Sequence, residues 1–332
     1  MLPGSRARFL RTTASGGAAL FGASIAVGRA DAVFRMSIPE AQTHPIYLSM
    51  VSFAQLVARN SHGALKVELY PNGSLAREQD SVNGLQTGTI DMCVQTTAYL
   101  ESIVKRIQAL DLPFLFRDRK TAERMLDGEV GKQISTELAQ RGIITLAWGT
   151  AGWRQITFTE KRVSKPEDMR GLRVRIQNGA VYASMMKALG AIPIVIDIAE
   201  TYLALQQKTV DGLDLPLLSL LTQNFYQVAK HITLTNHLYN PQLVLMSKQR
   251  FDGLAPDQQR VLVDAGASTQ RYLRNLVADA QAGTLQALKD KGLTVDQIDY
   301  PAFRTAMNPV YAEYREKLGA EAFDAIMRQS QR

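Results

Sequence analysis

Hydrophobic residues alternate between strand-like and helix-like spacings along most of the chain. Residues 34–38 indicate a short strand, and apolar positions 46, 50, 53 and 57 then lie on one helix face. Thr43-His44-Pro45 precedes that helix as a cap followed by a proline. Residues 65–70 alternate as a second strand before the turn Pro71-Asn72-Gly73. This β-α-β-α order predicts an α/β fold with a mostly parallel sheet and helices on its faces.

A second series of the same kind begins near residue 143. Runs 143–148 and 154–159 indicate strands joined by a glycine-rich turn at 149–152. Further strands at 171–176 and 210–214 alternate with helical patterns that begin near 182 and 202. With 332 residues and 46% hydrophobic composition, the chain is long enough for two α/β domains with separate cores.

Pro256 to Lys291 keeps one apolar helical face for many turns. A helix of that length extends about 50 Å, which is longer than one small domain, so we expect it to span two. Gly266 and Gly283 weaken the pattern locally, and a break at either is an open alternative. No low-complexity linker occurs, so we expect several short crossovers between the domains.

The N-terminus has the pattern of an export signal. Arg6, Arg8 and Arg11 precede a short apolar segment at 18–27, and Ala30-Asp31-Ala32 fits an A-x-A cleavage site. We therefore predict that residues 1–32 are a cleaved signal peptide. A membrane anchor or a first core helix is the alternative, but the apolar run is shorter than the roughly 18 residues a span needs. The block also resembles a twin-arginine signal with Ala7 in place of one arginine, so both that route and general secretion stay open.

Charge and composition narrow the chemistry. Loss of residues 1–32 removes four arginines and one aspartate, so the net charge falls from +7 to +4. The remaining charges are mixed and form no basic run, which argues against nucleic-acid binding and suits an anionic ligand. The single cysteine, Cys93, lies in a strand-like run and is expected to be a buried apolar side chain.

Sequence motifs of enzymes and metal sites are missing. The four histidines have no metal-ligand spacing, and no nucleophile elbow, Walker loop or G-x-G-x-x-G helix start occurs. We therefore expect no catalytic residue, no cofactor and no metal.

Several motifs occur in an order that is specific as a set. They run from Gly63 to Asp91, then through Asp111-Leu112-Pro113-Phe114, Gly171-Leu172-Arg173-Val174-Arg175, Lys187-Ala188-Leu189-Gly190-Ala191-Ile192-Pro193, Glu200-Thr201-Tyr202-Leu203-Ala204-Leu205-Gln206, Asp211-Gly212, Phe225-Tyr226-Gln227-Val228 and Leu234-Thr235-Asn236-His237. Over nearly the whole mature chain, this order resembles the binding proteins of tripartite ATP-independent periplasmic (TRAP) transporters. The resemblance implies a periplasmic binding protein fold, in which two α/β domains enclose a ligand cleft and a long helix spans both.

The resemblance also implies where the domains divide. We expect domain I to contain 33–151 plus about 241–282, and domain II to contain 152–240 plus about 283–332. The hinge is then near 151–152 and 240–241, and closure around the ligand creates the surface that the transporter reads.

Arg175 is the first candidate for the binding site, at the end of a strand beside the inferred cleft. The matching arginine in the family binds the substrate carboxylate, and a guanidinium suits that task because it is planar, bidentate and permanently charged. Arg154 matches a second ligand-contacting arginine, although a structural role for it is an alternative. Two such cations would repel in a closed cleft until an anion enters. Arg173 is expected to be an ordinary solvated arginine.

Two positions depart from the family pattern. Leu215 stands where the family commonly has a ligand-contacting asparagine, and Ile198 replaces a pocket aromatic of some members. Both changes make that side of the pocket more apolar. They favour a monocarboxylate or an acid with a hydrophobic body over a heavily hydroxylated sugar acid.

Further candidates lie at strand ends. Ser37, Gln95 and Thr96 are placed to bond a hydroxyl or keto oxygen, or else they only satisfy turns. Trp153 is a candidate for the pocket wall, with a core position as the alternative. His44 and Tyr239 are weaker candidates of the same kind.

These observations together predict a periplasmic solute-binding protein of a TRAP transporter in a Gram-negative type of cell. Its ligand is expected to be a small organic acid, and its partners the small and large membrane subunits of the permease. We expect a monomer with no nucleic-acid partner. The alternatives are a binding protein that serves another importer or a sensor kinase, and an exported hydrolase.

Overall fold

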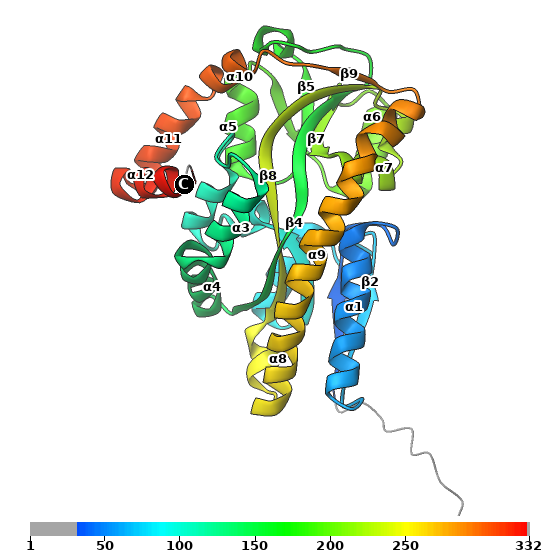
Figure 1. Cartoon of the computed structure of the whole chain (residues 1–332), viewed down its shortest axis with the longest axis vertical. Coiled ribbons are helices and arrows are strands. Elements are labelled where there is room, and N and C mark those ends of the chain that lie inside the picture. Colours follow the sequence, from blue (N-terminus) through cyan, green and yellow to red (C-terminus); the bar gives the residue numbers. More distant parts are fainter. Residues whose placement is uncertain (1–31, 331–332) are drawn as a thin grey trace, which may run out of the picture.

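Strand segments from both series of the sequence hydrogen-bond into one sheet in the computed structural model, which describes residues 32–330 (Figure 1). Within these residues the strand order is β2-β1-β3-β8-β4-β7-β5-β6, with β9 beside β8. The strands are β1 (Ala32–Ser37), β2 (Leu65–Tyr70), β3 (Met92–Thr96), β4 (Ile143–Phe158), β5 (Arg173–Ile176), β6 (Ile192–Val195), β7 (Gly212–Pro216), β8 (His231–Ser247) and β9 (Thr294–Asp296).

Helices cover the sheet and extend from its ends. They are α1 (Pro45–Asn60), α2 (Glu78–Thr87), α3 (Arg119–Asp127), α4 (Glu129–Gln140), α5 (Ala180–Ala188), α6 (Ile198–Gln206), α7 (Leu217–Thr222), α8 (Lys248–Asp252), α9 (Pro256–Asp290), α10 (Tyr300–Ala306), α11 (Asn308–Leu318) and α12 (Ala320–Gln329). Short 3-10 turns lie at Thr97–Leu100, Lys105–Asp111, Pro166–Met169 and Phe225–Gln227. The predicted start of α1 is confirmed, because the ring of His44 accepts a hydrogen bond from the backbone of Ile46 at 3.1 Å.

The long strands β4 and β8 connect two halves of the molecule. β3 pairs with the 242–246 part of β8, and β1 and β2 follow it outward. At the other end β7 pairs with the 154–158 part of β4, and β5 and β6 follow. The outer pairs are parallel, as the β-α-β rhythm predicts, whereas β3–β8, β4–β8 and β4–β7 are antiparallel. The two-domain α/β architecture is therefore confirmed, and its strands form one mixed sheet.

The glycine-rich segment 149–152 was predicted as a turn, and this prediction is wrong. The segment continues β4, with a register shift between Thr150 and Trp153 opposite β8. Gly152 has a φ of +93°, which a glycine adopts without strain, so the irregularity is absorbed as a bulge rather than a reversal. The shift lies beside the hinge positions 151–152 and 240–241. The domain boundaries built on those positions stay a prediction.

Helix α9 runs along both halves without interruption, as Figure 1 shows in orange. It packs against α1, β4 and α7. At Gly266 a side chain would lie 2.3 Å from the Leu146 carbonyl oxygen, so this glycine allows close helix–strand contact. The predicted spanning helix is confirmed, and neither glycine breaks it.

Three further sequence predictions concern the N-terminal segment, membrane-spanning helices and Cys93. The predicted signal peptide lies outside the described residues, except for Ala32, which begins β1. In the part that the structure describes, no helix has the length and apolar character needed to cross a bilayer. Cys93 is fully buried, and burial raises the pKa of its thiol to about 12, which fits its predicted place in the core.

Candidate functional site

A small cavity lies between the two halves, where the C-terminal ends of β1, β3, β5 and β7 approach one another. Ends of strands in α/β sheets are where ligands commonly bind. The cavity encloses about 40 Å³. Its lining residues are Pro39, Glu40, Glu78, Gln95, Thr96, Tyr99, Ala151, Arg154, Arg175, Gln177, Ile198, Leu215, Pro216, Ser219, Asn240 and Gln242.

Six of the eight residues predicted for the site line this cavity. They are Arg175, Arg154, Leu215, Ile198, Gln95 and Thr96. Ser37 and Trp153 do not line it. The hydroxyl of Ser37 donates to the Ala76 carbonyl at 3.0 Å, and the ring of Trp153 packs edge-on against Tyr239 at 5.3 Å between centroids. These two contacts fit the alternatives of a satisfied turn and a core aromatic.

Arg175 presents a buried cation to the cavity. It is the third residue of β5, its exposed fraction is 3%, and its Nε donates to the Ile196 carbonyl at 2.8 Å. Within residues 32–330 its terminal nitrogens form no hydrogen bond or ion pair. Burial lowers the pKa of this guanidinium, and nearby Tyr99 partly opposes that effect. A desolvated guanidinium with free terminal nitrogens is a site for a carboxylate.

Arg154 differs from Arg175 because its charge has a protein partner. Its Nε donates to the Asp214 carboxylate at 2.9 Å, and a terminal nitrogen donates to the Asp214 carbonyl at 2.6 Å. Both residues are buried, and His237 lies 3.3 Å from the same carboxylate. Burial acts to raise the pKa of Asp214, but Arg154 and His237 hold it below its usual value. From the sequence, both arginines are expected to lack a counter-ion, but in the structure Arg154 is paired and only Arg175 is unpaired among the described lining residues.

Residues from the opposite half supply mainly hydrogen-bond acceptors. Glu40 follows β1 and has an exposed fraction of 4%, and one of its oxygens accepts from the Gln242 side chain at 2.5 Å. Its second oxygen has no partner in the described residues, and the same is true of the side-chain carbonyls of Gln95 and Gln242 and of the Thr96 hydroxyl. Burial raises the pKa of Glu40 to about 7. Unpartnered buried polar atoms are costly, so a cluster of them beside a cavity indicates a ligand.

Leu215 and Ile198 form an apolar section of the wall on the other half. Leu215 belongs to β7, and Ile198 begins α6. The apolar pocket expected from these two residues is therefore one side of the cavity, and the side that carries Glu40 is polar.

Glu40, Glu78 and Gln242 line the cavity but are not predicted from the sequence. The position of Glu40 behind a predicted strand was a usable signal, because strand ends were the criterion applied to Ser37. Gln242 lies inside a long strand, and nothing in its local sequence marks it.

Contacts between 77–101 and 178–200 bridge the two halves around the cavity. The Glu78 carboxylate accepts from the Ile198 backbone at 2.9 Å, and Arg77 lies 2.6 Å from the Glu200 carboxylate. Burial raises the pKa of Glu78. These contacts join the two halves beside the cavity.

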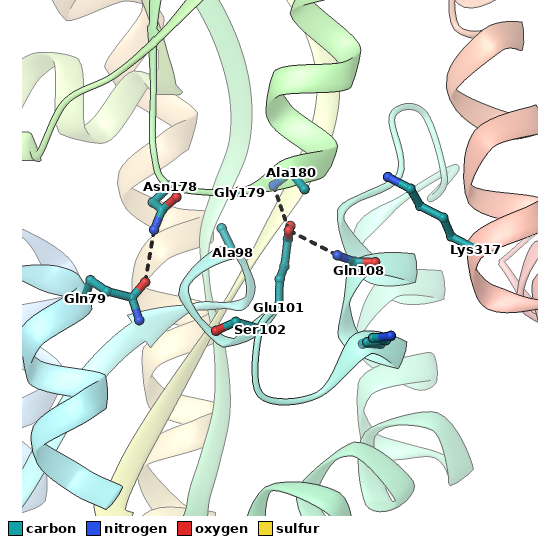
Figure 2. A pocket seen from close by; sticks show the side chains of 10 residues that line it. Gln79, Ala98, Glu101, Ser102, Gln108, Asn178, Gly179, Ala180 and Lys317 are labelled. Carbon is teal, nitrogen blue, oxygen red and sulfur yellow. Dashed lines mark hydrogen bonds between the residues drawn. The ribbon is translucent and has the colours of Figure 1, made fainter. Parts of the chain in front are cut away.

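A second, wider cavity of about 500 Å³ also lies between the halves (Figure 2). Its buried Glu101 accepts from the Ala180 backbone at 2.7 Å and from Gln108 at 3.4 Å, and Asn178 donates to Gln79 at 3.1 Å. One Glu101 oxygen is buried without a hydrogen bond, as in the smaller cavity, but among residues 32–330 no buried unpaired cation lines this second cavity to receive a carboxylate. The smaller cavity is therefore the better candidate for a ligand site.

Neither of the weaker candidates lines the smaller cavity. His44 is buried as the cap of α1, and Tyr239 packs between Phe116 and Trp153. In the part of the chain that the structure describes, no group of three or more His, Cys, Asp or Glu could hold a metal ion.

Comparisons with known proteins agree with this geometry. Residues 36–317 match the family model of the bacterial extracellular solute-binding proteins, family 7. The 2,3-diketo-L-gulonate-binding periplasmic protein of Escherichia coli K12 is 33% identical over 82% of this chain and 84% of its own. The C4-dicarboxylate-binding periplasmic protein of Rhodobacter capsulatus is also 33% identical, with the same coverage.

The chain is also similar to a solved structure, that of a TRAP periplasmic solute-binding protein from Polaromonas sp. JS666 bound to D-erythronate. It is 30% identical, has a TM-score of 0.86, and the match covers 89% of this chain and 98% of that one.

Proposed function

The chain belongs to family 7 of the bacterial extracellular solute-binding proteins, the binding proteins of TRAP transporters, and from this premise we propose that it captures a small organic acid by its carboxylate and delivers it unchanged to the permease. Arg175 is the residue to which we assign the carboxylate. Arg154, Leu215, Ile198, Gln95 and Thr96 complete the binding surface, with Glu40, Glu78 and Gln242 added to those predicted from the sequence.

One observation supports this function above all: the terminal nitrogens of the buried Arg175 have no protein partner among residues 32–330. A cation in that position is unfavourable when the halves are closed, unless an anion joins it. The carboxylate of a ligand supplies that anion and two parallel hydrogen bonds. Ligand binding therefore stabilises the closed form more than the open one, and this difference is what drives closure.

The size of the cavity fits a site that opens and closes. A space of about 40 Å³ within a closed interface admits a ligand only when the halves separate. The register shift in β4 beside Gly152 is a place where that motion can occur with little disturbance of either half. The hinge predicted near 151–152 and 240–241 is part of this proposal.

Location and partners follow from the family. We assign the protein to the periplasm, with residues 1–32 as its signal peptide, and we assign the small and large TRAP membrane subunits as its partners. The relatives bind a diketogulonate, a C4-dicarboxylate and D-erythronate, so an organic acid is the ligand class they share.

A ligand screen tests the function. The full chain is exported in a Gram-negative host, and the processed protein is purified, unfolded and refolded to remove any carried ligand. A thermal-shift screen then covers keto acids, hydroxy acids, dicarboxylates, aromatic acids and sugar acids. Ligand at a hundred times its dissociation constant adds about 2.7 kcal/mol of stability, which is a readable shift. Absence of a shift with every carboxylate, in protein that is demonstrably folded, rejects the organic-acid function. Recovery of a chemically altered acid rejects the binding-only role.

A further inference from the structure

The wall opposite Arg175 carries a buried carboxylate that has no cation beside it. Glu40 forms no ion pair within residues 32–330, and its one side-chain partner is the amide of Gln242 at 2.5 Å. The other carboxylate oxygen is buried and has no hydrogen-bond partner in the described part of the chain. An ionised or neutral carboxyl in this state gains from any hydrogen-bond donor that approaches it.

The neighbours of Glu40 reinforce its acceptor character. Gln242 uses its amide nitrogen on Glu40, and Gln95 uses its amide nitrogen on the Ser81 hydroxyl at 3.1 Å. Both side-chain carbonyls are thereby left buried and without a partner. Three residues from separate segments that line the cavity therefore each hold an unfilled acceptor. Hydroxyl groups of a ligand are donors of the right size to fill them.

The charges around the cavity also favour a ligand with a single carboxylate. Arg154 is neutralised by Asp214 at 2.9 Å, so Arg175 is the one uncommitted cation among the described lining residues. Glu40 and Glu78 are carboxylates on the same cavity. One ligand carboxylate is matched by Arg175, and a second would face these acids with no cation to receive it. Such a like-charge contact is unfavourable and weakens binding.

We propose that the cavity selects hydroxylated monocarboxylates and rejects dicarboxylates, and that Glu40 is the residue that sets this selection. This inference rests on the proposed function, since it assumes a carboxylate on Arg175, and it assigns the far end of the ligand to the acceptor wall. The two relatives at 33% identity bind acids of both kinds, so family membership leaves the choice open.

Leu215 and Ile198 do not oppose this selection. They lie on the other half of the molecule, where they contact the carbon skeleton of a ligand whose hydroxyls point to Glu40. The ligand class differs from the one that these two residues favour in the sequence, because the sequence does not reveal the polar wall opposite them.

The test compares three acids on one carbon skeleton by titration calorimetry at pH 8, where Glu40 is largely ionised. The four-carbon set is D-erythronate, butyrate and meso-tartrate; the six-carbon set is D-galactonate, hexanoate and galactarate. If the broad screen finds its acid on another skeleton, the same three-way comparison is made there. We expect the hydroxylated monocarboxylate to bind about 10- to 100-fold more tightly than the bare acid. The matching dicarboxylate is expected to bind at least about 100-fold more weakly.

Glu40→Gln tests the residue itself. The isosteric amide keeps the contact with Gln242 and removes the negative charge, so the dicarboxylate gains and the hydroxylated monocarboxylate loses about 10-fold in affinity. Glu101→Gln is the matched control, because Glu101 is also a buried carboxyl without an ion pair, and its pKa is likewise raised to about 7 by burial. It lines the other cavity (Figure 2) and contacts Ala180 across the two halves, so its substitution is expected to change both affinities in the same direction, whereas Glu40→Gln changes them in opposite directions.

The outcomes separate this inference from the proposed function. A dicarboxylate that binds as tightly as its monocarboxylate analogue, or a bare acid that matches the hydroxylated one, overturns the selection and leaves an organic-acid receptor intact. Equal effects of Glu40→Gln and Glu101→Gln overturn the role of Glu40. If no acid of any class binds, the proposed function and the selection fall together. The wild-type comparison needs no variant, so poor folding of Glu40→Gln does not remove the test.

Discussion

Replacing Arg175 by methionine is expected to remove ligand binding while leaving the fold in place. Methionine keeps an unbranched side chain in the space beside Ile196 and removes the guanidinium. The terminal nitrogens that are lost have no protein partner among the described residues, so their removal deletes hydrogen bonds to the ligand carboxylate and none to the protein. Truncating one partner of a buried charge pair costs about 2–5 kcal/mol, which is about 30- to 5,000-fold in affinity.

The stability of the ligand-free protein is expected to respond differently. The substitution deletes one hydrogen bond, from the Arg175 Nε to the Ile196 carbonyl at 2.8 Å, which is worth about 1 kcal/mol. It also removes a buried cation whose desolvation is unfavourable in the closed form. The two effects oppose each other, so the free energy of unfolding should change by no more than about 1 kcal/mol.

Arg173→Met is the matched control. Arg173 lies two residues earlier on β5, its side chain is 41% exposed, and it pairs with Asp211 at 2.7 Å, away from the cavity. Titration calorimetry with the acid that the wild type binds best, and urea unfolding without ligand, are measured for both variants. We expect Arg173→Met to bind as the wild type does. Wild-type affinity in Arg175→Met, or an equal loss in Arg173→Met, refutes the assignment of the carboxylate to Arg175.

Three further predictions concern stability. Asp214→Asn leaves the buried Arg154 without its counter-ion and should lower the free energy of unfolding by about 3–5 kcal/mol, whereas a loss below 1 kcal/mol in urea unfolding would contradict the ion pair. Burial lowers the pKa of His44 from 6.5 to about 3, so its stabilising effect is complete above pH 6.5 and is lost as the pH falls toward 3. Between pH 8 and pH 5 the free energy of unfolding of the wild type should therefore fall by about 2 kcal/mol more than that of His44→Asn. Parallel curves of unfolding free energy against pH for the two proteins would exclude this. Gly152→Ala places a side chain on a residue with a φ of +93° and should lower the free energy of unfolding by about 1–2 kcal/mol. Gly283→Ala, on the open face of α9, should leave the free energy of unfolding unchanged or raise it, and thermal melts of both variants test this difference.

Elements with a strong local period were predictable from the sequence. The apolar face of α9 repeats over its whole length, so its existence and span followed from spacing alone. Segment 149–152 was not predictable in the same way. Its glycines indicate a turn when taken alone, and they continue a strand because β8 supplies hydrogen-bond partners on either side of the bulge. That pairing is a long-range property, which no local window contains.

The residues of the candidate site also differ in whether local sequence could reveal them. Arg175 could be found because its motif resembles the one that carries the family's carboxylate-binding arginine, and because its place near a strand end and its chemistry are local features. The pairing of Glu40 with Gln242 could not, because these residues lie 202 positions apart in the sequence. They meet only because β3 brings the end of β1 beside β8. A polar wall assembled in this way leaves no motif.

Of the two buried arginines, only Arg154 has an ion-pair partner among the described residues, which shows why residue identity alone does not define this site. Arg154 and Asp214 are 60 positions apart, and they meet because β4 and β7 are antiparallel, with Arg154 opposite Pro216. Arg175 lies on β5, and no acid forms an ion pair with it among the described residues. The sheet therefore neutralises one cation within the fold and leaves the other for a ligand. A cavity with one uncommitted positive charge, facing two carboxylates, is suited to a ligand with one negative charge and donors at its far end. The strand order, which fixes where the counter-ion lies, thus determines which arginine is available for recognition.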